Sequence, residues 1–423
     1  MLDPKWVREH PELVKAAGQK KHMPCEELVD EFVDVDRELR RVLPEIEGLR
    51  AEQKQSGKAV GKASPEERPA LLQRQGEIKK RIQELGKRQK ELQERREFLL
   101  LRLPNPPADD VPEGKDESQN IEIRRHGEPP RFDFEPKDHV ELGELHGLLD
   151  VPRAVKIAGS RNYFLRGDAV LLEEAVLRLA LEHMVGKGFE PLSVPQLVRE
   201  EAMYGTAYFP GGEEQAYSCE KDDLYLVGTA EVSLTAFHGD EILDPKELPR
   251  RYVARSSCYR REAGTYGKDT RGLYRVHQFQ KVEQVVVDIA DEAKSKQHHQ
   301  AILENSCEIV EALELPYRVV NVCGGDLGQG QVQKFDIETW MPSRGDYGET
   351  HSASRFHEFQ ARRLKLRYRG EDGKARIAHT LNNTVVASPR ILIALIENHQ
   401  QADGSIAIPK ALQPYFGREK IGG

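Results

Sequence analysis

The densest group of side chains that could do chemistry lies in residues 255–283, which read RSSCYRREAGTYGKDTRGLYRVHQFQKVE. If each end of this segment is a β-strand, alternate residues of each strand share one face. The two faces would carry Cys258, Arg260 and Glu262, and Phe279, Lys281 and Glu283. A guanidinium, carboxylates and an aromatic ring can together hold an anion, an amine and a flat base, which an amino acid and a nucleotide require. A surface sheet with cross-strand ion pairs is the alternative.

Between these two strands lies a stretch of glycines and charged residues that is too long for a tight hairpin turn. It contains Gly264, Gly267, Lys268, Asp269, Arg271, Gly272 and Arg275. Long loops inside compact domains usually carry function, because their side chains are not needed for the core. We therefore expect this loop to contact a ligand.

Other nucleotide-binding and metal-binding patterns are absent or weak. The sequence has no Walker P-loop, and the glycine-rich run 324–330 lacks the spacing of a dinucleotide-binding turn. His298 and His299 are adjacent on an expected helix and cannot share one face, so we expect a solvated helix surface and not a zinc pair. The five cysteines form no CxxC pair, which predicts reduced thiols without zinc.

Residues 25–103 show a heptad pattern that predicts two long helices. Apolar residues recur at alternating spacings of four and three in the first helix, and a similar seam follows in the second. They are Leu28, Phe32, Val35, Leu39, Val42, Ile46 and Leu49, and then Leu71, Ile78, Ile82, Leu85, Leu92, Leu99 and Leu103. Turn-forming residues between Gly57 and Pro65 should fold the helices into an antiparallel coiled-coil hairpin, which must project about 50 Å. Pro44 should kink the first helix.

The outer half of this hairpin is basic, although the whole chain has a net charge of -8. Residues 51–100 hold 13 Lys or Arg against 8 acidic residues, a local charge of +5. A basic surface of this kind can bind phosphates, but it is also typical of a solvated coiled coil. Both interpretations stay open on charge alone.

A proline-rich break at residues 104–107 ends the second helix and predicts two domains, residues 1–105 and residues 106–423. In the second domain, irregularly alternating helical and strand-like segments suit a mainly antiparallel sheet flanked by helices, which makes the chain α+β. No apolar run reaches 18 residues and the first 21 residues carry charges throughout, so we expect a cytoplasmic protein without membrane contact.

The segment 255–283 resembles motif 2 of class II aminoacyl-tRNA synthetases, and its REAG, DTRGL and HQFQKVE runs look like the seryl-specific form. Further segments are similar to bacterial seryl-tRNA synthetases, in order along the whole chain. They are MLDPKWVREHPELV, LPNPPADDVPEGKDESQN, GSRNYFLRG, GFEPLSVPQLV, LVGTAEVSLT, CGGDLGQGQVQKFDIETWMP, EFQARRLKLRYR and LIENHQQADGSIAIPKAL.

This resemblance implies an enzyme that activates L-serine with ATP to seryl-adenylate and transfers the seryl group to the 3′ end of tRNA(Ser). It leaves tRNA(Sec) open as a second substrate. The hairpin would be the tRNA-binding arm of residues 1–105, and residues 106–423 would be a class II catalytic domain. GFEPLSVPQLV, with Pro195, would be motif 1, which builds a homodimer interface in this class.

The resemblance also implies roles for individual residues. Thr229, Ala230 and Glu231 would bind serine, Glu283 would hold its ammonium group, and Thr384 would contact its hydroxyl. Arg260 would bind the α-phosphate and the serine carboxylate, Glu262 the adenine amino group, Phe279 the adenine face, and Arg275 and Arg390 the outer phosphates. Glu349 and Ser352 would hold Mg²⁺. The full implied ATP site is Arg260, Arg261, Glu262, Arg275, Phe279, Glu349, Thr350, His351, Ser352 and Arg390, with Arg260, Glu283, Glu349 and Arg390 as the catalytic set.

The sequence departs from the family pattern in three places. Arg261 replaces a common serine in motif 2, the run 351–355 is HSASR, and motif 3 reads NNTVVASPR over residues 382–390, a glycine-poor form similar to the eukaryotic branch. The change at 351–355 puts the cavity wall in doubt, whereas motif 2 retains Arg260 and Glu262 and motif 3 retains Thr384 and Arg390. Two other functions stay open: an amino acid:carrier-protein ligase, which would lack the arm, and a non-catalytic RNA-binding paralogue, which would have lost the catalytic set.

Overall fold

The computed structural model describes residues 1–264 and 271–422, which form two compact units, Met1–Pro106 and Pro107–Gly423. Of the predicted loop residues, Gly267, Lys268 and Asp269 lie outside the described part. Within that part, no helix has both the length and the apolar character needed to cross a membrane.

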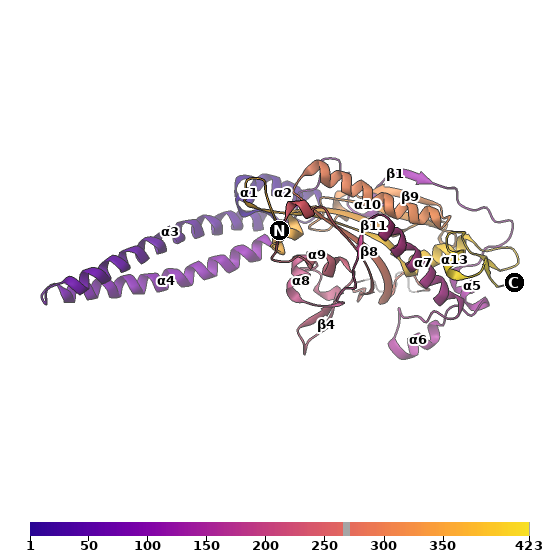
Figure 1. Ribbon diagram of the computed structural model, residues 1–423, viewed down its shortest axis with the longest axis horizontal. Coiled ribbons are helices and arrows are strands. Elements are labelled where there is room, and N and C mark those ends of the chain that lie inside the picture. Colours follow the sequence, from indigo (N-terminus) through magenta and orange to yellow (C-terminus); the bar gives the residue numbers. More distant parts are fainter. Residues whose placement is uncertain (265–270, 423) are drawn as a thin grey trace. The chain divides into compact units, whose positions relative to one another are not determined.

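The first unit is helical, with α1 (Pro4–Glu9), α2 (Pro11–Lys20), α3 (Glu26–Lys62) and α4 (Arg68–Leu100). The two long helices α3 and α4 pack against each other as a hairpin, as Figure 1 shows. Leu39, Val42 and Ile46 of α3 are buried against Leu85 and Leu92 of α4, which is the predicted seam. The coiled-coil hairpin is thus confirmed. Pro44 lies inside α3, which continues through it from Glu26 to Lys62, so the kink or local irregularity expected there stays a prediction.

Four arginines of α4 pair with four glutamates of α3 along one edge of the hairpin. The pairs are Arg95–Glu31, Arg88–Glu38, Arg81–Glu45 and Arg74–Glu52, with N–O distances of 2.5 to 2.8 Å. Successive pairs are seven residues apart on each helix, which fixes the helices as antiparallel and in register. Each pair is solvent-exposed, and an exposed ion pair contributes little to stability alone. These arginines are therefore engaged within the arm, and much of its unpaired positive charge is carried by lysines.

A buried carboxylate interrupts the seam near the base of the hairpin. Asp36 is 1% exposed and pairs with Arg8 of α1 at 2.8 Å and with Arg96 of α4 at 3.4 Å. Arg96 lies between Leu92 and Leu99 of the seam, at a position where the heptad period calls for an apolar residue. Its contact with Asp36 explains the substitution, because a buried charge needs an opposite charge beside it.

The second unit is built on an eight-stranded sheet with the order β1-β9-β10-β11-β14-β8-β7-β2. All neighbours pair antiparallel except β2 and β7, which confirms the predicted sheet. The strands are β1 (Ile121–His126), β2 (Glu190–Pro191), β7 (Arg250–Tyr259), β8 (Gln278–Asp288), β9 (Tyr317–Asn321), β10 (Gln333–Met341), β11 (Asp346–His357) and β14 (His379–Ala387).

The two faces of β8 have different partners. Val282 and Val286 belong to the main core with the helices α7 (Asp168–Gly186), α10 (Glu292–Ala312) and α12 (Ser388–Asn398). Figure 1 shows α7 and α10 lying over the sheet. Val285 and Val287 point the other way, into a smaller core with α9 (Glu231–Ala236) and α11 (Phe359–Arg363). Because side chains alternate along a strand, Lys281 and Glu283 share this second face.

Shorter elements complete the second unit. The helices are α5 (His139–Leu145), α6 (Val151–Ala158), α8 (Glu200–Gly205) and α13 (Gln413–Phe416). The strands are β3 (Leu197–Arg199), β4 (Tyr217–Cys219), β5 (Leu224–Leu226), β6 (Ile242–Leu243), β12 (Arg367–Arg369), β13 (Ala375–Ile377), β15 (Ile406–Ala407) and β16 (Lys420–Ile421).

The prediction of a solvated surface at His298 and His299 is wrong. The side chain of His299 is 2% exposed, stacks on Phe335 and hydrogen-bonds the Ala353 carbonyl oxygen at 2.9 Å. His298 pairs with the buried Asp288 at 2.8 Å. The helix α10 packs on β11 and β14, so two successive residues can both meet protein when the helix lies deep in the fold.

Candidate active site

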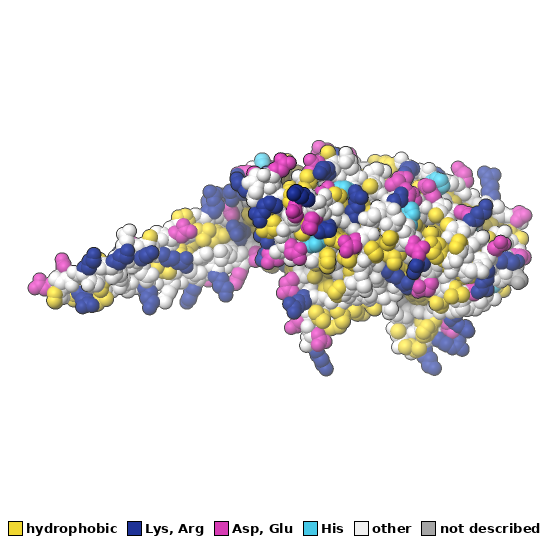
Figure 2. All heavy atoms as spheres, viewed as in Figure 1, with side chains coloured by type: hydrophobic (Ala, Val, Ile, Leu, Met, Phe, Trp, Pro, Cys, Tyr) yellow, Lys and Arg dark blue, Asp and Glu magenta, His cyan; other side chains and the backbone are white. Residues whose placement is uncertain are grey.

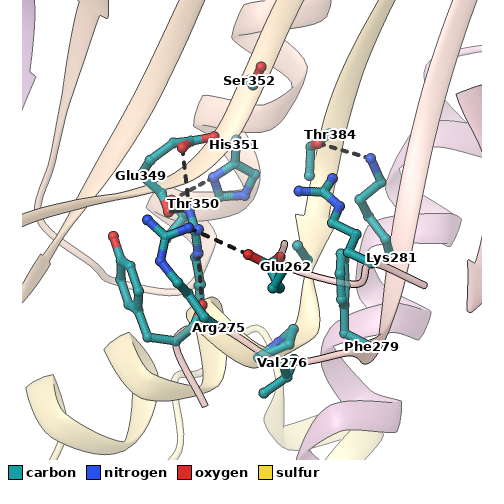
Figure 3. A pocket seen from close by; sticks show the side chains of 15 residues that line it. Glu262, Arg275, Val276, Phe279, Lys281, Glu349, Thr350, His351, Ser352 and Thr384 are labelled. Atoms are coloured by element: carbon teal, nitrogen blue, oxygen red, sulfur yellow. Dashed lines mark hydrogen bonds and ion pairs between the residues drawn. The ribbon is translucent and has the colours of Figure 1, made fainter. Parts of the chain in front are cut away.

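A pocket opens where β7, β8, β11 and β14 meet the first turn of α12 (Figure 3). Its wall brings together residues that are up to 130 positions apart in the sequence. The lining residues are Arg260, Glu262, Tyr274, Arg275, Val276, Phe279, Lys281, Glu349, Thr350, His351, Ser352, Thr384, Ala387, Pro389 and Arg390. Most of the predicted ATP-site residues are among them. Arg261 is not, and it is exposed.

Arg260 and Phe279 form one side of the pocket. Cys258 of β7 pairs with Phe279 of β8, and β7 ends at Tyr259, so Arg260 follows the strand instead of lying within it. Its backbone N–H donates to the His277 carbonyl oxygen at 2.9 Å, which holds the turn in place. The Arg260 guanidinium lies 5.3 Å from the centre of the Phe279 ring. This pair offers a cation and an aromatic face to one ligand.

Glu262 lies beyond the end of β7 and does not have a strand conformation. Its φ is 51°, a left-handed conformation that is uncommon for a residue with a side chain. Its carboxylate pairs with Arg275 at 3.5 Å, and both line the pocket. The prediction that Glu262 shares a strand face with Cys258 and Arg260 is therefore wrong. The residue reaches the pocket by a turn after β7.

Glu349 and Arg390 face each other on the opposite side of the pocket. Arg390 donates to the backbone oxygen of Glu349 at 2.7 Å and lies 3.4 Å from its carboxylate. Burial acts to raise the pKa of Glu349, but the charges of Arg390, Lys334 and Arg260 outweigh it and hold the pKa below its usual value. Glu349 is thus an anion, ready for a cationic partner.

The donor set at Glu349 and Ser352 suits Mg²⁺. A carboxylate and a hydroxyl are hard oxygen ligands, and Mg²⁺ commonly uses few protein ligands together with phosphates. These two oxygen ligands fit a Mg²⁺ ion that arrives with the phosphates of a nucleotide. In residues 1–264 and 271–422, no cluster of three or more His, Cys, Asp or Glu is placed to hold a metal.

A second group of polar side chains is almost fully buried, and two of its members, Lys281 and Thr384, also line the pocket. Lys281 and Glu283 are 5% and 2% exposed, and Thr384 is 9% exposed. Thr384 lies directly opposite Glu283 in the β8–β14 pair. Figure 3 shows Lys281 and Thr384 side by side.

The Thr-Ala-Glu run is also buried, but it does not line the pocket itself. The Thr229 hydroxyl accepts from the Glu231 backbone N–H at 3.2 Å. The Glu231 carboxylate accepts from Gln360 at 2.8 Å and from the Tyr208 hydroxyl at 3.2 Å. Ala230 is fully buried just before α9. Burial, followed by the nearby charge of Glu283, raises the pKa of Glu231 to about 7, so the two carboxylates belong to one electrostatic site.

Sequence reasoning assigned no role to Lys281, Tyr208 or Gln360. The period of two along β8 put Lys281 on the same face as Glu283, so a signal was present for it. Tyr208 follows α8 and Gln360 lies on α11, and only the folded chain brings them both to Glu231. No spacing in the sequence could reveal that contact.

The departures from the family pattern mostly face away from the pocket. Arg355 is fully buried and pairs with Glu292 of α10 at 2.7 Å, while Val385 and Val386 belong to the main core. His351 does line the pocket and hydrogen-bonds Thr350 at 2.8 Å, and burial lowers its pKa to about 4. His351 is therefore a neutral part of the wall.

Comparison with known proteins gives two family matches. Residues 1–107 match the seryl-tRNA synthetase N-terminal domain, and residues 216–399 match the tRNA synthetase class II core domain (G, H, P, S and T). The serine–tRNA ligase of Deinococcus radiodurans is 47% identical over 423 residues, which is all of this chain and 99% of the relative. That of Rubrobacter xylanophilus is 46% identical, again over all of this chain and 99% of the relative.

Solved structures agree. The seryl-tRNA synthetase from Pyrococcus horikoshii, complexed with ATP, superposes with a TM-score of 0.94 at 42% identity and covers 100% of this chain and 99% of its own. The cytoplasmic serine–tRNA ligase from Naegleria fowleri, in complex with AMP, gives a TM-score of 0.88 at 30% identity, covering 100% of this chain and 98% of its own.

The raised pKa of Glu231 predicts a pH-dependent stability. An unfolded glutamate titrates near about 4.3, below the folded value of about 7. The folded state therefore binds this proton more tightly and loses stability as pH rises from roughly 4.5 to 7. We predict that Glu231→Gln removes this loss, so that its melting temperature rises relative to wild type between pH 5 and pH 8.

The matched control is Glu214→Gln, because Glu214 is exposed in the same unit. Thermal melts at several pH values should give this control a profile parallel to that of wild type. A parallel profile for Glu231→Gln as well would show that the buried carboxylate does not titrate in this range.

Proposed function

Because the chain belongs to the seryl-tRNA synthetase family, we propose that it is an ATP-dependent serine–tRNA ligase, which joins L-serine to AMP and then to the 3′ end of tRNA. The observation that carries this proposal is full-length identity of 44% to 47% with serine–tRNA ligases. The matching region includes both the arm and the class II core. The carrier-protein alternative is disfavoured by the arm, and a non-catalytic paralogue by the presence of Arg260, Glu283, Glu349 and Arg390 in one site region.

The pocket suits attack of the serine carboxylate on the α-phosphorus of ATP. That step needs positioning and charge neutralisation more than an acid or a base. We assign Arg260 to the α-phosphate and the serine carboxylate, and Phe279 and Glu262 to the adenine. Arg275 and Arg390 would bind the outer phosphates. The 5.3 Å spacing of Arg260 and Phe279 supports binding of a phosphate and a base at neighbouring positions.

Glu349 and Ser352 would hold Mg²⁺, which neutralises phosphate charge when it is bound. Arg390 contacts Glu349 in the structure and supplies a second positive charge at the same place. Thr229, Ala230, Glu231, Glu283 and Thr384 are assigned to serine, since they form a small, buried polar site that suits a small hydroxylated substrate.

The tRNA is assigned to residues 1–105. Figure 2 shows Lys and Arg side chains along the hairpin. The arginine–glutamate pairs occupy one edge, whereas the exposed Lys54, Lys58, Lys62, Lys80 and Lys87 form no ion pair in the described part of the chain. Unpaired lysines are available for phosphates, and A-form RNA is bound largely through phosphates and shape. tRNA(Ser) is the expected substrate, and tRNA(Sec) stays open as a second one.

A homodimer through motif 1 is part of the proposal. Exposed apolar side chains on α6, α7 and β3 support it: Ile157, Leu171 and Leu197 are 74%, 48% and 45% exposed. Leu197 belongs to the motif 1 segment itself. We expect a dimer mass in light scattering, and a monomer mass at micromolar concentration would contradict the assignment.

A cytoplasmic location is also part of the proposal, because the assigned substrates are used there. Cell fractionation can test it.

We predict that, among the twenty amino acids, only serine supports strong ATP–pyrophosphate exchange. A site that hydrogen-bonds a substrate hydroxyl rejects analogues that lack one, by up to about 10⁴-fold or more. Equal exchange with alanine or glycine would overturn the assigned serine site.

We also predict that Arg260→Lys slows activation. The variant keeps the positive charge but loses the planar guanidinium fork, so the rate of serine-dependent ATP–pyrophosphate exchange should fall roughly 30- to 1000-fold.

We predict that shortening the arm separates the two half-reactions. In all four arginine–glutamate pairs the residue numbers add to 126, so residues 54 and 72 face each other across the hairpin. Replacing residues 54–72 with a short Gly-Ser turn therefore keeps the remaining seam and pairs in register. Serine-dependent exchange should stay near the wild-type rate, whereas kcat/KM for tRNA should collapse and the salt dependence of tRNA binding should flatten.

A full-length control separates charge from shape. Changing Lys54, Lys58 and Lys62 to Gln leaves the hairpin intact but removes three cations, and should lower the salt slope by about one for each lost phosphate contact. If the shortened enzyme charged tRNA with unchanged kcat/KM, the arm would be only a structural coiled coil.

A further inference from the structure

Residues 271–277, which we call the return limb, lead the chain back to the start of β8. Two of them, Tyr274 and Arg275, line the pocket. The Tyr274 backbone oxygen accepts from Arg390 Nε at 3.3 Å, and the centre of the Tyr274 ring lies 4.5 Å from the Arg390 guanidinium carbon. The position of the return limb therefore decides where Arg275 and Arg390, the two arginines assigned to the outer phosphates, lie in the pocket.

A buried histidine of α5 contacts the return limb from outside the pocket. His139 is the first residue of α5 and is 8% exposed. Beside it, Asp138 pairs with Arg271 at 2.9 Å. The Leu273 backbone N–H donates to His139 Nε2 at 3.2 Å. Gly272 has a φ of 73°, and a Cβ atom on it would lie 1.9 Å from the same nitrogen, so glycine is the residue that fits this close approach.

A buried glutamate fixes the histidine ring. Glu397 of α12 is fully buried, and its Oε1 lies 2.7 Å from His139 Nδ1 and accepts from the His139 backbone N–H at 3.0 Å. The Leu273 N–H can donate only to a ring nitrogen without a proton, so Nε2 is the acceptor and Nδ1 carries the proton that points to Glu397. Glu397 thus sets both the orientation and the tautomer of His139.

The same glutamate connects the histidine to two other walls of the pocket. Its Oε2 accepts from the Ser343 backbone N–H at 2.9 Å, in the turn after β10. The next residue of that turn, Arg344, places its guanidinium carbon 4.2 Å from the centre of the Tyr274 ring. Glu397 and Arg390 are seven residues apart on α12, so two turns of one helix join them. One carboxylate therefore holds the limb, the turn and the helix in a fixed relation.

From these contacts we infer that His139 is a positioning residue for ATP: held by Glu397, its Nε2 anchors the return limb and so places Tyr274 and Arg275 in the pocket. The inference rests on the proposed function, because it adds residues outside the pocket on which the assigned ATP site depends. Neither His139 nor Glu397 lines the pocket, so both act through the limb. The alternative is a histidine–glutamate pair that only stabilises the core.

A positioning role predicts a particular kinetic change. Without its anchor, the return limb leaves its place for part of the time, and the apparent affinity for ATP decreases by the fraction of enzyme that stays competent. Once ATP is bound with the limb in place, the reaction is unaltered, so KM for ATP rises while kcat stays the same. KM for serine should not change, because the assigned serine site lies on β8, β14 and the start of α9.

Two substitutions separate the two contacts of the ring. His139→Gln places an amide oxygen near the position of Nε2, where it can accept from Leu273, but loses the donor to Glu397. His139→Asn keeps an amide donor near the position of Nδ1 for Glu397, but loses the acceptor for Leu273. We expect His139→Asn to raise KM for ATP in ATP–pyrophosphate exchange about 10- to 100-fold, the effect of leaving one buried N–H without its acceptor. His139→Gln should raise it much less.

Thermal stability should follow the opposite order. His139→Gln leaves the buried Glu397 without its imidazole partner, so this variant should have the lower melting temperature of the two. If KM for ATP instead followed the melting temperature, with His139→Gln the more impaired variant, the pair would be only structural and the inference would be wrong.

The matched control is His146→Asn, at the other end of α5. His146 Nε2 lies 2.6 Å from the Gly404 carbonyl oxygen, and His146 does not line the pocket. This variant should leave KM for ATP unchanged, whatever it does to the melting temperature. A rise in KM as large as that of His139→Asn would assign the effect to α5 as a whole and would overturn the role of His139.

A second readout needs no substrate. The Leu273 amide is buried and hydrogen-bonded, so its hydrogen–deuterium exchange, followed by mass spectrometry of the return limb, should be slow in the wild type. His139→Asn should exchange this amide about 10- to 100-fold faster, and His139→Gln should stay close to the wild type. Unchanged protection in His139→Asn would overturn the anchor. If the wild type gave no serine-dependent ATP–pyrophosphate exchange while His139→Asn still lost protection at Leu273, the proposed function would fail and the anchor would stand.

Discussion

A charged side chain can be buried only if an opposite charge or several hydrogen bonds lie beside it, and this constraint shapes both units of the chain. In the helical unit it is seen at Asp36, where two arginines from different helices meet one carboxylate. In the catalytic unit it appears repeatedly, because binding a zwitterion and a nucleotide requires charges inside a folded wall. Lys281 with Glu283 is such a pair.

The antiparallel sheet places partners beside buried charges mainly through its regular strand geometry. Strands β8 and β14 lie in the middle of the sheet, where one face can bury valines against α7, α10 and α12 while the other presents polar residues. Because side chains alternate along β8, Val282 lies on the opposite face of the sheet from Lys281 and Glu283. Strand ends and bulges then supply what regular strands cannot, such as the turn that brings Glu262 to the pocket.

The sequence predicted those parts of the fold that depend on local periodicity. The heptads located the hairpin because a coiled coil buries the same positions of every heptad. The antiparallel sheet was predicted from the alternation of apolar and polar residues and from composition. The sequence did not predict the burial of His299 or the pairing of His298 with Asp288, since both depend on how deeply α10 lies against the sheet. Most implied ATP-site residues do line one pocket. Tyr208 and Gln360 could not be found beforehand, because they meet Glu231 only through long-range packing.

The arginine–glutamate pairs of the arm also bear on how its length can change. Both the seam and the pairs repeat every seven residues on each helix, and every pair is aligned about one fixed turn. Inserting or deleting seven residues in each helix would thus keep every remaining contact and move only the tip, by about 10 Å. Reach along the arm is therefore a modular property: evolution or design can alter it in discrete steps while the inner contacts of the hairpin stay the same.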